Sequence, residues 1–431
     1  MVTYMAKYSE MSKEELQAEY ELVRESYVKL CEKGLNLDMS RGKPGPDQLA
    51  ISTKVMDLVN HDLGFRNRDG IDCRNYGGLD GLSELKELFS EILEVPTDRI
   101  IVGGNSSLNM MFDVVAQAMT HGMGKEPWLL QGKIKFLCPV PGYDRHFAIC
   151  EHFGIEMINV PMTPEGPDMD IVEELIKDEK VKGMWCVPKY SNPDGIVYSD
   201  ETVRRLANMR PAAEDFRILW DNAYTVHPVF GECDKLLNIY EECIKSGDPD
   251  KVIIFTSTSK ITFPGAGVAA LASSQPNIAA IKQRMNYQTI GPDKINQLRH
   301  ARMFPNLDAI TEHMKYHAAV LAPKFETVLN ELDKQLGGLD IATWSHPKGG
   351  YFISMFAMKG CAKRIVYLCN QAGLNLTAAG ATYPYGIDPD DSNIRIAPSF
   401  PSPDELQVAT ELLCTVTRLT ALEKLLDRSK G

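Results

Sequence analysis

The stretch VIIFTSTSKITFPGAG, at positions 252–267, decides the fold. Residues 252–255 form a short, continuous apolar run, which is typical of a strand buried on both faces of a parallel sheet. Four hydroxyl residues follow, and then Lys260. A lysine just past a buried strand can have its amine desolvated, which lowers the pKa of the amine and makes it a nucleophile toward carbonyl groups. Taken alone, Lys260 could equally be an exposed loop lysine.

Two stretches upstream suit a cofactor with a pyridine ring. Residues 218–220 read as another buried strand, and Asp221 stands at its end. A carboxylate there costs free energy unless it is paired, and a cationic ring nitrogen is a suitable partner. Tyr224 follows three residues later and can offer a phenol to the same ring. In VPKYSNPDG, at 187–195, the Asn192-Pro193 pair predicts a turn that aims an amide at the sheet edge.

The order Asn192, Asp221, Tyr224 and Lys260, each after a predicted strand, resembles the fold-type I enzymes of pyridoxal 5′-phosphate (PLP). More narrowly, it is similar to the class I/II aminotransferases. This resemblance implies that Lys260 is the Schiff-base lysine and that Asp221 pairs with the pyridinium nitrogen. It also implies that Asn192 and Tyr224 bond to the ring hydroxyl, that Asn192 contacts the substrate as well, and that Asp221, Tyr224 and Lys260 are the catalytic residues.

The chain departs from this family after Lys260. Relatives usually place a phosphate-binding arginine seven or eight residues later, where this chain has Gly267 and Val268. The phosphate would then rest on Ser257 and Ser259, with an additional basic residue left unplaced. This departure and the loop SRGKP, at 40–44, resemble a divergent bacterial aspartate aminotransferase branch.

Three further stretches match the family's cofactor contacts. Backbone N–H groups of a Gly-rich turn at a helix start make an anion site without any basic residue. By resemblance this turn is the phosphate cup, and it contains Gly104, Asn105 and Ser106. Tyr143, after Pro-Gly, is expected to stack on the pyridine ring or else to pack under a helix start. Tyr76, before a Gly-Gly turn, would reach the phosphate of a neighbouring subunit, which implies a homodimer with shared sites, or would be a core tyrosine.

Substrate contacts are expected at both ends of the chain. Arg395 lies between Ile394 and Ile396 in NIRIAPSFP. Such alternation is ordinary on the exposed face of an antiparallel strand, but by resemblance the guanidinium clamps the substrate α-carboxylate in two parallel bonds. Gly42 belongs to a loop that lines the substrate pocket in the family. Arg41 is the expected contact for a distal carboxylate, and a solvated loop charge is the alternative.

Composition limits the class of protein. The chain has 431 residues, 44% of them hydrophobic, and a formal charge of −12, which argues against nucleic acid as a partner. Ten cysteines without a CxxC pair indicate reduced thiols, with neither disulfides nor a metal site. No apolar segment reaches the length of a membrane span or a signal peptide. The sequence therefore predicts a cytoplasmic protein with no membrane partner.

The fold class expected is α/β. Strand–helix alternation over about residues 98–275 favours one large, doubly wound sheet. The resemblance implies a large PLP-binding domain at 51–305, with a mostly parallel seven-stranded type of sheet sandwiched by helices. The smaller α+β domain combines both chain ends, with an N-terminal segment at 1–50 and a C-terminal part at 306–431.

The function implied is transamination by a ping-pong mechanism, with small-molecule amino acids and 2-oxo acids as substrates. L-Aspartate and 2-oxoglutarate, giving oxaloacetate and L-glutamate, are the expected pair. Another PLP reaction, or transamination of aromatic or neutral amino acids, is the alternative, because the same fold and lysine serve several chemistries. A non-catalytic PLP-binding regulatory module is a more distant one, because no basic helix-turn-helix extension is present.

Overall fold

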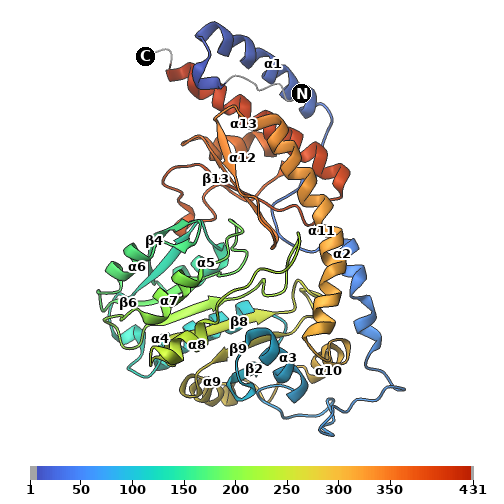
Figure 1. Cartoon of the computed structure of the whole chain (residues 1–431), viewed down its shortest axis with the longest axis vertical. Coiled ribbons are helices and arrows are strands. Elements are labelled where there is room, and N and C mark those ends of the chain that lie inside the picture. The colour runs from blue at the N-terminus through green and yellow to red at the C-terminus, as the bar shows by residue number, and fades with distance from the viewer. Residues whose placement is uncertain (1–6, 429–431) are drawn as a thin grey trace. The chain divides into compact units, whose positions relative to one another are not determined.

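A computed structural model describes residues 7–428 of the chain (Figure 1). The chain divides into two compact units. Unit 1 contains Met1–Pro46, Asn192–Gly195 and Ala319–Gly431. Unit 2 contains Asp47–Ser191 and Ile196–Ala318. A short piece of the middle of the chain, with the Asn-Pro turn, therefore belongs to the same unit as the two chain ends.

Unit 2 is built around a sheet of eight strands in the order β2-β9-β8-β7-β6-β3-β4-β5, counted over the described residues. The five strands from β8 to β4 are mutually parallel, whereas β2, β9 and β5 pair antiparallel with their neighbours. The strand bounds are β2 Ile100–Val102, β3 Lys135–Val140, β4 Glu156–Thr163, β5 Gly166–Pro167, β6 Val181–Cys186, β7 Arg217–Asp221, β8 Val252–Ser257 and β9 Ala269–Ser273.

Helices cover both faces of this sheet, because its central strands are apolar on both sides. Ile218 and Trp220 of β7 join one core cluster with residues of the helices α3, α6, α7 and α8, whereas the intervening Leu219 is buried outside that cluster. Helices α4 and α5 pack against other strands of the sheet. The bounds are α2 Pro46–Ile51, α3 Ser83–Leu93, α4 Ser107–His121, α5 Asp144–His152, α6 Met169–Leu175, α7 Asp200–Asn208, α8 Ile239–Lys245, α9 Gln275–Gln288 and α10 Lys294–Met303.

The expected α/β class, with one large sheet flanked by helices, is confirmed. The sheet is mixed, because β9 runs antiparallel between β2 and β8. The two-residue strand β5 adds an eighth member at the edge beside β4. The continuous apolar runs around residues 181–187, 218–220 and 252–255 are the buried strands β6, β7 and β8, in which every residue is buried.

Unit 1 combines a three-stranded antiparallel sheet, in the order β10-β11-β13, with helices from both ends of the chain. Ser12 caps α1, and its side chain and that of Glu15 form a capping box. Helix α1 packs against α13. The bounds are β10 Ala342–Trp344, β11 Ile353–Ala357, β13 Asn393–Ile396, the paired strands β1 Leu37–Asp38 and β12 Leu374–Asn375, and the helices α1 Lys13–Cys31, α12 Ala362–Gln371 and α13 Pro403–Arg428. Helix α11, Leu307–Leu336, belongs to unit 2 up to Ala318 and to unit 1 from Ala319.

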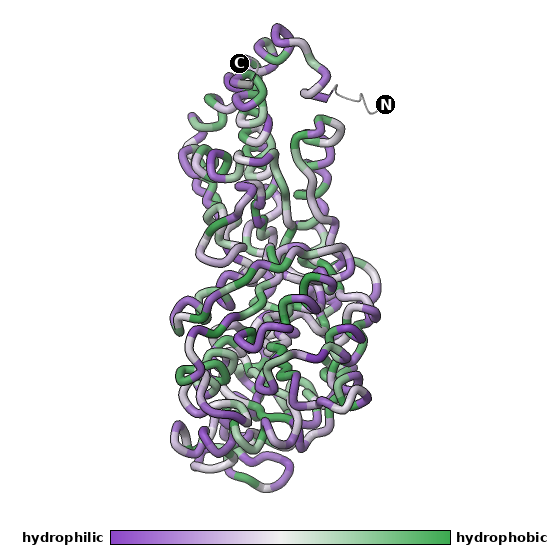
Figure 2. Tube along the Cα trace, turned by 90° about the vertical axis from the view of Figure 1, so that its left-hand side faces the viewer, coloured by the Kyte–Doolittle hydropathy of each residue, from purple (hydrophilic) through white to green (hydrophobic). Residues whose placement is uncertain are grey.

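Within residues 7–428, no helix is long and apolar enough to cross a membrane. Figure 2 shows hydrophilic segments interrupting the hydrophobic ones along the trace.

Candidate active site

The chemistry-bearing residues of unit 2 gather where β6, β7 and β8 end. These strands are parallel neighbours, so their carboxyl ends meet at one edge of the sheet, where ligands bind in open α/β folds. Asp221 is the last residue of β7 and lies opposite Phe255 of β8. Lys260 follows the end of β8 by three residues. The sheet therefore brings the carboxylate and the amine together although they are far apart in sequence.

Lys260 is half-buried. Its Nζ atom lies 5.0 Å from the centre of the Tyr224 ring, and Tyr224 itself is buried. Burial lowers the pKa of the Lys260 amine below its ordinary value, while the negative charge of Asp221 opposes this shift. The amine is therefore poised to lose its proton more readily than a surface lysine, as a nucleophile toward carbonyl groups requires.

Asp221 has one satisfied and one unsatisfied oxygen. Its Oδ2 atom lies 2.9 Å from Nε2 of His146, whose ring stacks on Trp185 at a centroid distance of 4.3 Å. Its Oδ1 atom is buried, and no described residue donates a hydrogen bond to it. A buried carboxylate oxygen without a donor costs free energy. The geometry at Asp221 thus provides a place for a cationic or N–H donor.

Sequence reasoning missed His146. The one available signal was its position three residues after Tyr143, because residues three apart near a helix start lie on the same side. The Tyr143 ring stands edge-on to His146 at a centroid distance of 4.9 Å, so both rings belong to the surroundings of Asp221. Tyr143 is half-buried, as a residue at the wall of a site would be.

The expected anion cup lies at the start of α4. Gly104 and Asn105 are exposed, and Ser106 is half-buried as the N-cap of the helix. The hydroxyl of Ser257 donates to Oγ of Ser259 at 3.0 Å, and the Ser259 hydroxyl donates to the backbone oxygen of Asn105 at 3.4 Å. The two serines and the helix start are therefore joined, and together they offer hydroxyl and N–H groups to an anion.

Gly267 is one of the two positions, with Val268, where the resemblance to the family places a phosphate-binding arginine. A Cβ atom there would lie 2.9 Å from the backbone oxygen of Phe263 and 3.0 Å from Oγ1 of Thr258. Any side chain would therefore require its neighbours to shift.

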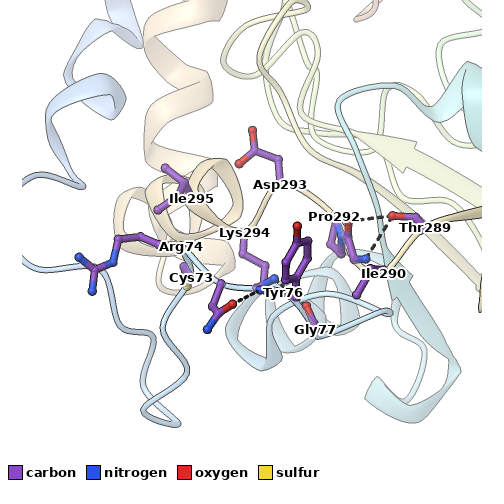
Figure 3. Close-up of a pocket in the computed structure, with 12 residues that line it drawn as sticks. Cys73, Arg74, Tyr76, Gly77, Thr289, Ile290, Pro292, Asp293, Lys294 and Ile295 are labelled. Carbon is purple, nitrogen blue, oxygen red and sulfur yellow. Dashed lines mark hydrogen bonds between the residues drawn. The ribbon is translucent and has the colours of Figure 1, made fainter.

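Tyr76 is 82% exposed and lines a surface cleft of about 670 Å³ (Figure 3). The cleft is formed by residues 73–77 and 289–295. Nζ of Lys294 donates to the backbone oxygen of Gly77 at 2.6 Å, which fixes the turn after Tyr76. The alternative of a core tyrosine is wrong, because the ring is open to solvent in the isolated chain.

In unit 1, Arg395 is buried rather than on an exposed face of the sheet, so the alternative of a solvated strand residue is wrong. Its Nη1 donates to Oδ1 of Asn192 at 3.3 Å, and its Nη2 donates to Oγ1 of Thr377 at 3.4 Å. The guanidinium lies over the Phe352 ring, 4.9 Å from its centre. The structure thus joins the two expected substrate contacts Arg395 and Asn192, which are 203 positions apart.

The loop with Arg41 and Gly42 packs on the same aromatic ring. A Cβ atom on Gly42 would lie 2.4 Å from the Phe352 ring, so only glycine allows this approach. Arg41 is exposed. Lys43 is engaged elsewhere, with Nζ 3.8 Å from the centre of the Phe400 ring.

The fold, with a lysine after β8 and a buried carboxylate at the end of β7, is that of the aminotransferases. The chain belongs to the aspartate amino-transferase family, whose model matches residues 11–429. It is 45% identical over 423 residues to a protein of Mycolicibacterium smegmatis named as an aminotransferase, a match that covers 97% of this chain and 99% of the relative. It is 43% identical over 429 residues to the aspartate aminotransferase of Corynebacterium glutamicum, with coverage of 97% and 99%.

Solved structures agree with this assignment. The aspartate transaminase of Corynebacterium glutamicum superposes with a TM-score of 0.94 at 43% identity, covering 96% of this chain and 98% of that one. An α-aminoadipate aminotransferase of Thermus thermophilus, solved with N-(5′-phosphopyridoxyl)-L-leucine, has a TM-score of 0.73 at 19% identity, with coverage of 93% and 95%. The latter likeness concerns the fold alone. The protein is an aminotransferase.

Proposed function

We propose that the protein is a PLP-dependent aminotransferase that moves the amino group of L-aspartate to 2-oxoglutarate, yielding oxaloacetate and L-glutamate in two half-reactions. The observation that carries the proposal is the buried, unpartnered Oδ1 of Asp221 close to the desolvated Lys260 amine. The choice of aspartate rests on the aspartate aminotransferase of Corynebacterium glutamicum, at 43% identity over nearly the whole chain.

The residues of unit 2 fit a phosphorylated pyridine cofactor. A protonated ring nitrogen would supply the donor that Asp221 Oδ1 lacks. Ser257, Ser259 and the start of α4 would hold the phosphate, and Tyr224 would bond to the ring hydroxyl. The resemblance gives the same role to Asn192, which belongs to unit 1. When bound, PLP withdraws electrons from the carbon that carries the amino group and so makes its proton removable.

Each side chain then has a definite task. Lys260 would hold the cofactor covalently and would carry the proton from the substrate Cα, a role that suits an amine whose pKa is lowered by burial. Asp221 would keep the ring nitrogen protonated. His146 donates to Oδ2 of Asp221, so Oδ1 is the oxygen that would accept from the ring nitrogen.

The proposed substrate contacts lie in unit 1. Arg395 would bind the α-carboxylate with its planar guanidinium, which the Phe352 ring supports from one side. Asn192, which already accepts from Arg395, would help to orient the clamp. Arg41 would read the distal carboxylate that distinguishes aspartate and 2-oxoglutarate from neutral substrates.

The proposed active unit is a homodimer in which Tyr76 of each subunit reaches the cofactor phosphate of the other. The exposure of Tyr76 supports this assignment, because its ring is accessible to a second subunit. We also propose a reducing, cytoplasmic location, since all ten cysteines are free.

Absorbance of the purified protein, with and without L-aspartate, tests cofactor and reaction together. A yellow holoenzyme should bleach on addition of L-aspartate and release oxaloacetate, and 2-oxoglutarate should restore the colour. Release of pyruvate and ammonia from L-serine, which carries a leaving group on Cβ, would instead indicate elimination, and faster bleaching by aromatic or neutral amino acids would overturn the aspartate assignment. Lys260→Ala should abolish turnover and leave PLP bound only reversibly. Borohydride reduction followed by peptide mapping should place the pyridoxyl group on Lys260.

A further inference from the structure

Helix α10 carries a set of polar side chains that all bond outside the helix. They are Lys294, Asn296, Gln297 and His300. Their partners lie in three loops that are distant from one another in sequence. These are the turn after Tyr76, the turn before the anion cup and the turn that carries Lys260.

Asn296 holds the far side of the Lys260 turn. Its Nδ2 donates to the backbone oxygen of Ala266 at 3.0 Å and to that of Gly267 at 2.8 Å. These carbonyls belong to an irregular turn, in which backbone groups need partners other than a strand. The backbone up to Gly267, one of the two positions where the resemblance places an arginine, is therefore fixed by an amide from α10.

His300 holds the near side of the same turn. Its Nδ1 lies 2.8 Å from the backbone oxygen of Asn296, which can only accept, so Nδ1 carries the proton and Nε2 accepts. The Thr262 hydroxyl then donates to Nε2 at 2.8 Å, the Thr258 hydroxyl can donate to Thr262, and the Val268 N–H donates to Thr258. Burial lowers the pKa of His300, which keeps this acceptor neutral. This series of hydrogen bonds therefore connects His300 to both ends of the Lys260 turn, at Thr258 and at Val268.

Gln297 and Lys294 hold the other two loops. Nε2 of Gln297 donates to the backbone oxygens of Val102 and Gly103 at 3.2 and 3.0 Å, just before the anion cup, while Oε1 accepts from the Leu82 N–H. Nζ of Lys294 donates to the oxygen of Gly77. Asn296 and His300 are one turn apart on the helix, and Gln297 lies beside Asn296.

We propose that α10 is the positioning helix of the active site, whose side chains hold the Lys260 turn, the anion cup and the Tyr76 turn in register with one another. This inference rests on the proposed function, because the proposed function assigns these three loops to cofactor binding. The residues of α10 are positioning residues and need not touch the substrate. A misplacement of about 1 Å in a catalytic group can lower a rate about a hundredfold, so such anchoring has a measurable consequence.

The test compares Asn296 with Asn277. Both side-chain amides donate to backbone oxygens of loops, but the loops lie toward opposite ends of β8. Asn277 donates to the backbone oxygen of Asp250 at 2.8 Å and to Oγ of Ser273 at 2.9 Å, near the start of the strand. The holoenzymes of Asn296→Ala and Asn277→Ala are challenged with inorganic phosphate, and loss of the visible absorbance of the bound cofactor is followed. Asn296→Ala should release the cofactor at least about tenfold faster than wild type, whereas Asn277→Ala should match wild type.

A spectroscopic readout separates positioning from stability. Both variants should lower the melting temperature by similar amounts, but only Asn296→Ala should shift the pH at which the cofactor absorbance changes. Equal release rates and equal pH profiles in the two variants would overturn the inference. If Asn296→Ala does not fold, Gln297→Glu replaces it, because it keeps the acceptor for Leu82 and removes the donors to Val102 and Gly103. A wild-type protein that binds no PLP would instead overturn the proposed function.

Discussion

His146 and Asp221 form a buried pair in which Nε2 of the imidazole lies 2.9 Å from Oδ2 of the carboxylate. The His146 ring is nearly parallel to that of Trp185, at 8°, so its direction toward Asp221 is fixed by packing. The pair decides which carboxylate oxygen remains available. Asp221 therefore depends on α5 for its orientation as well as on β7 for its position.

His146→Phe should keep the stacking on Trp185 and remove the hydrogen bond to Asp221. A hydrogen bond to a charged group contributes about 1.5–3 kcal/mol, so the rate of the half-reaction with L-aspartate should fall about ten- to a hundredfold. Asp221→Ala should lose more, because the carboxylate itself is gone, and Asp221→Glu should be milder. Rapid-mixing absorbance on the folded variants measures the rate. A wild-type rate in His146→Phe would contradict the assigned role.

The part of the site that the sequence predicts is the part that follows strand ends. Asp221 and Lys260 come directly after continuous apolar runs, and parallel strands must bring such positions to one edge. His146 carries no comparable signal, because its partner is 75 positions away and its helix has no special composition. Arg395 shows the same limit. The alternation of apolar and polar residues around Arg395 would be the same whether its charge were exposed or buried. The residues that bury Arg395 include Asn192 and Phe352, which are distant from it in sequence.

The second prediction concerns Asp194 and the pH dependence of the free energy of unfolding. Burial raises the pKa of its carboxyl from 3.8 to about 6, against a hydrogen bond with Ser354 that lowers it. Its Oδ1 has no donor among the described residues. An acid whose pKa is raised by folding is favoured in its neutral form, so this contribution to stability is complete below about pH 4 and is lost as the pH rises through about 6.

Asp194→Asn should therefore stabilise the protein more at about pH 8 than at about pH 5. The difference should be about 1.4 kcal/mol, because the destabilising effect of the ionised carboxyl grows by about 1.4 kcal/mol per pH unit up to about pH 6 and is constant above it. Urea unfolding at both pH values measures the difference. Asp62→Asn is the matched control, since the Asp62 side chain is 97% exposed, and it should leave stability unchanged at both. An equal effect of Asp194→Asn at the two pH values would contradict the raised pKa.

The third prediction is that variants of Tyr76 and Lys260 restore activity to each other in mixed dimers. If the Tyr76 phenol reaches the neighbour's phosphate, Tyr76→Ala and Lys260→Ala each damage a different half of a shared site. A mixed dimer then has one site with both residues intact and one site with neither. Mixing the two inactive or weakened variants under conditions of subunit exchange should restore activity, up to one site per mixed dimer. A fully active monomer in sedimentation at the assay concentration would rule out the shared site.

The last prediction concerns Arg41 and the preference for substrates with a distal carboxylate. Gly42 lies against the Phe352 ring, and that ring supports Arg395, so Arg41 is the neighbour of a residue packed beside the proposed carboxylate clamp. Among the charges of this loop, Lys43 is held by Phe400 and lies 3.9 Å from Asp38, whereas no described residue pairs with the Arg41 guanidinium. A planar guanidinium also matches a carboxylate better than an ammonium does.

Arg41→Leu should raise KM for aspartate and 2-oxoglutarate and lower kcat/KM at least about tenfold, because a charge-assisted hydrogen bond contributes about 1.5–3 kcal/mol. Activity with alanine, which has no distal carboxylate, should change far less. Lys43→Leu removes a charge two positions away, one that is already engaged, and should leave the ratio of the two activities unchanged. Steady-state kinetics on both substrates with both variants give the comparison. Equal losses for aspartate and alanine in Arg41→Leu would show that another cation reads the distal carboxylate.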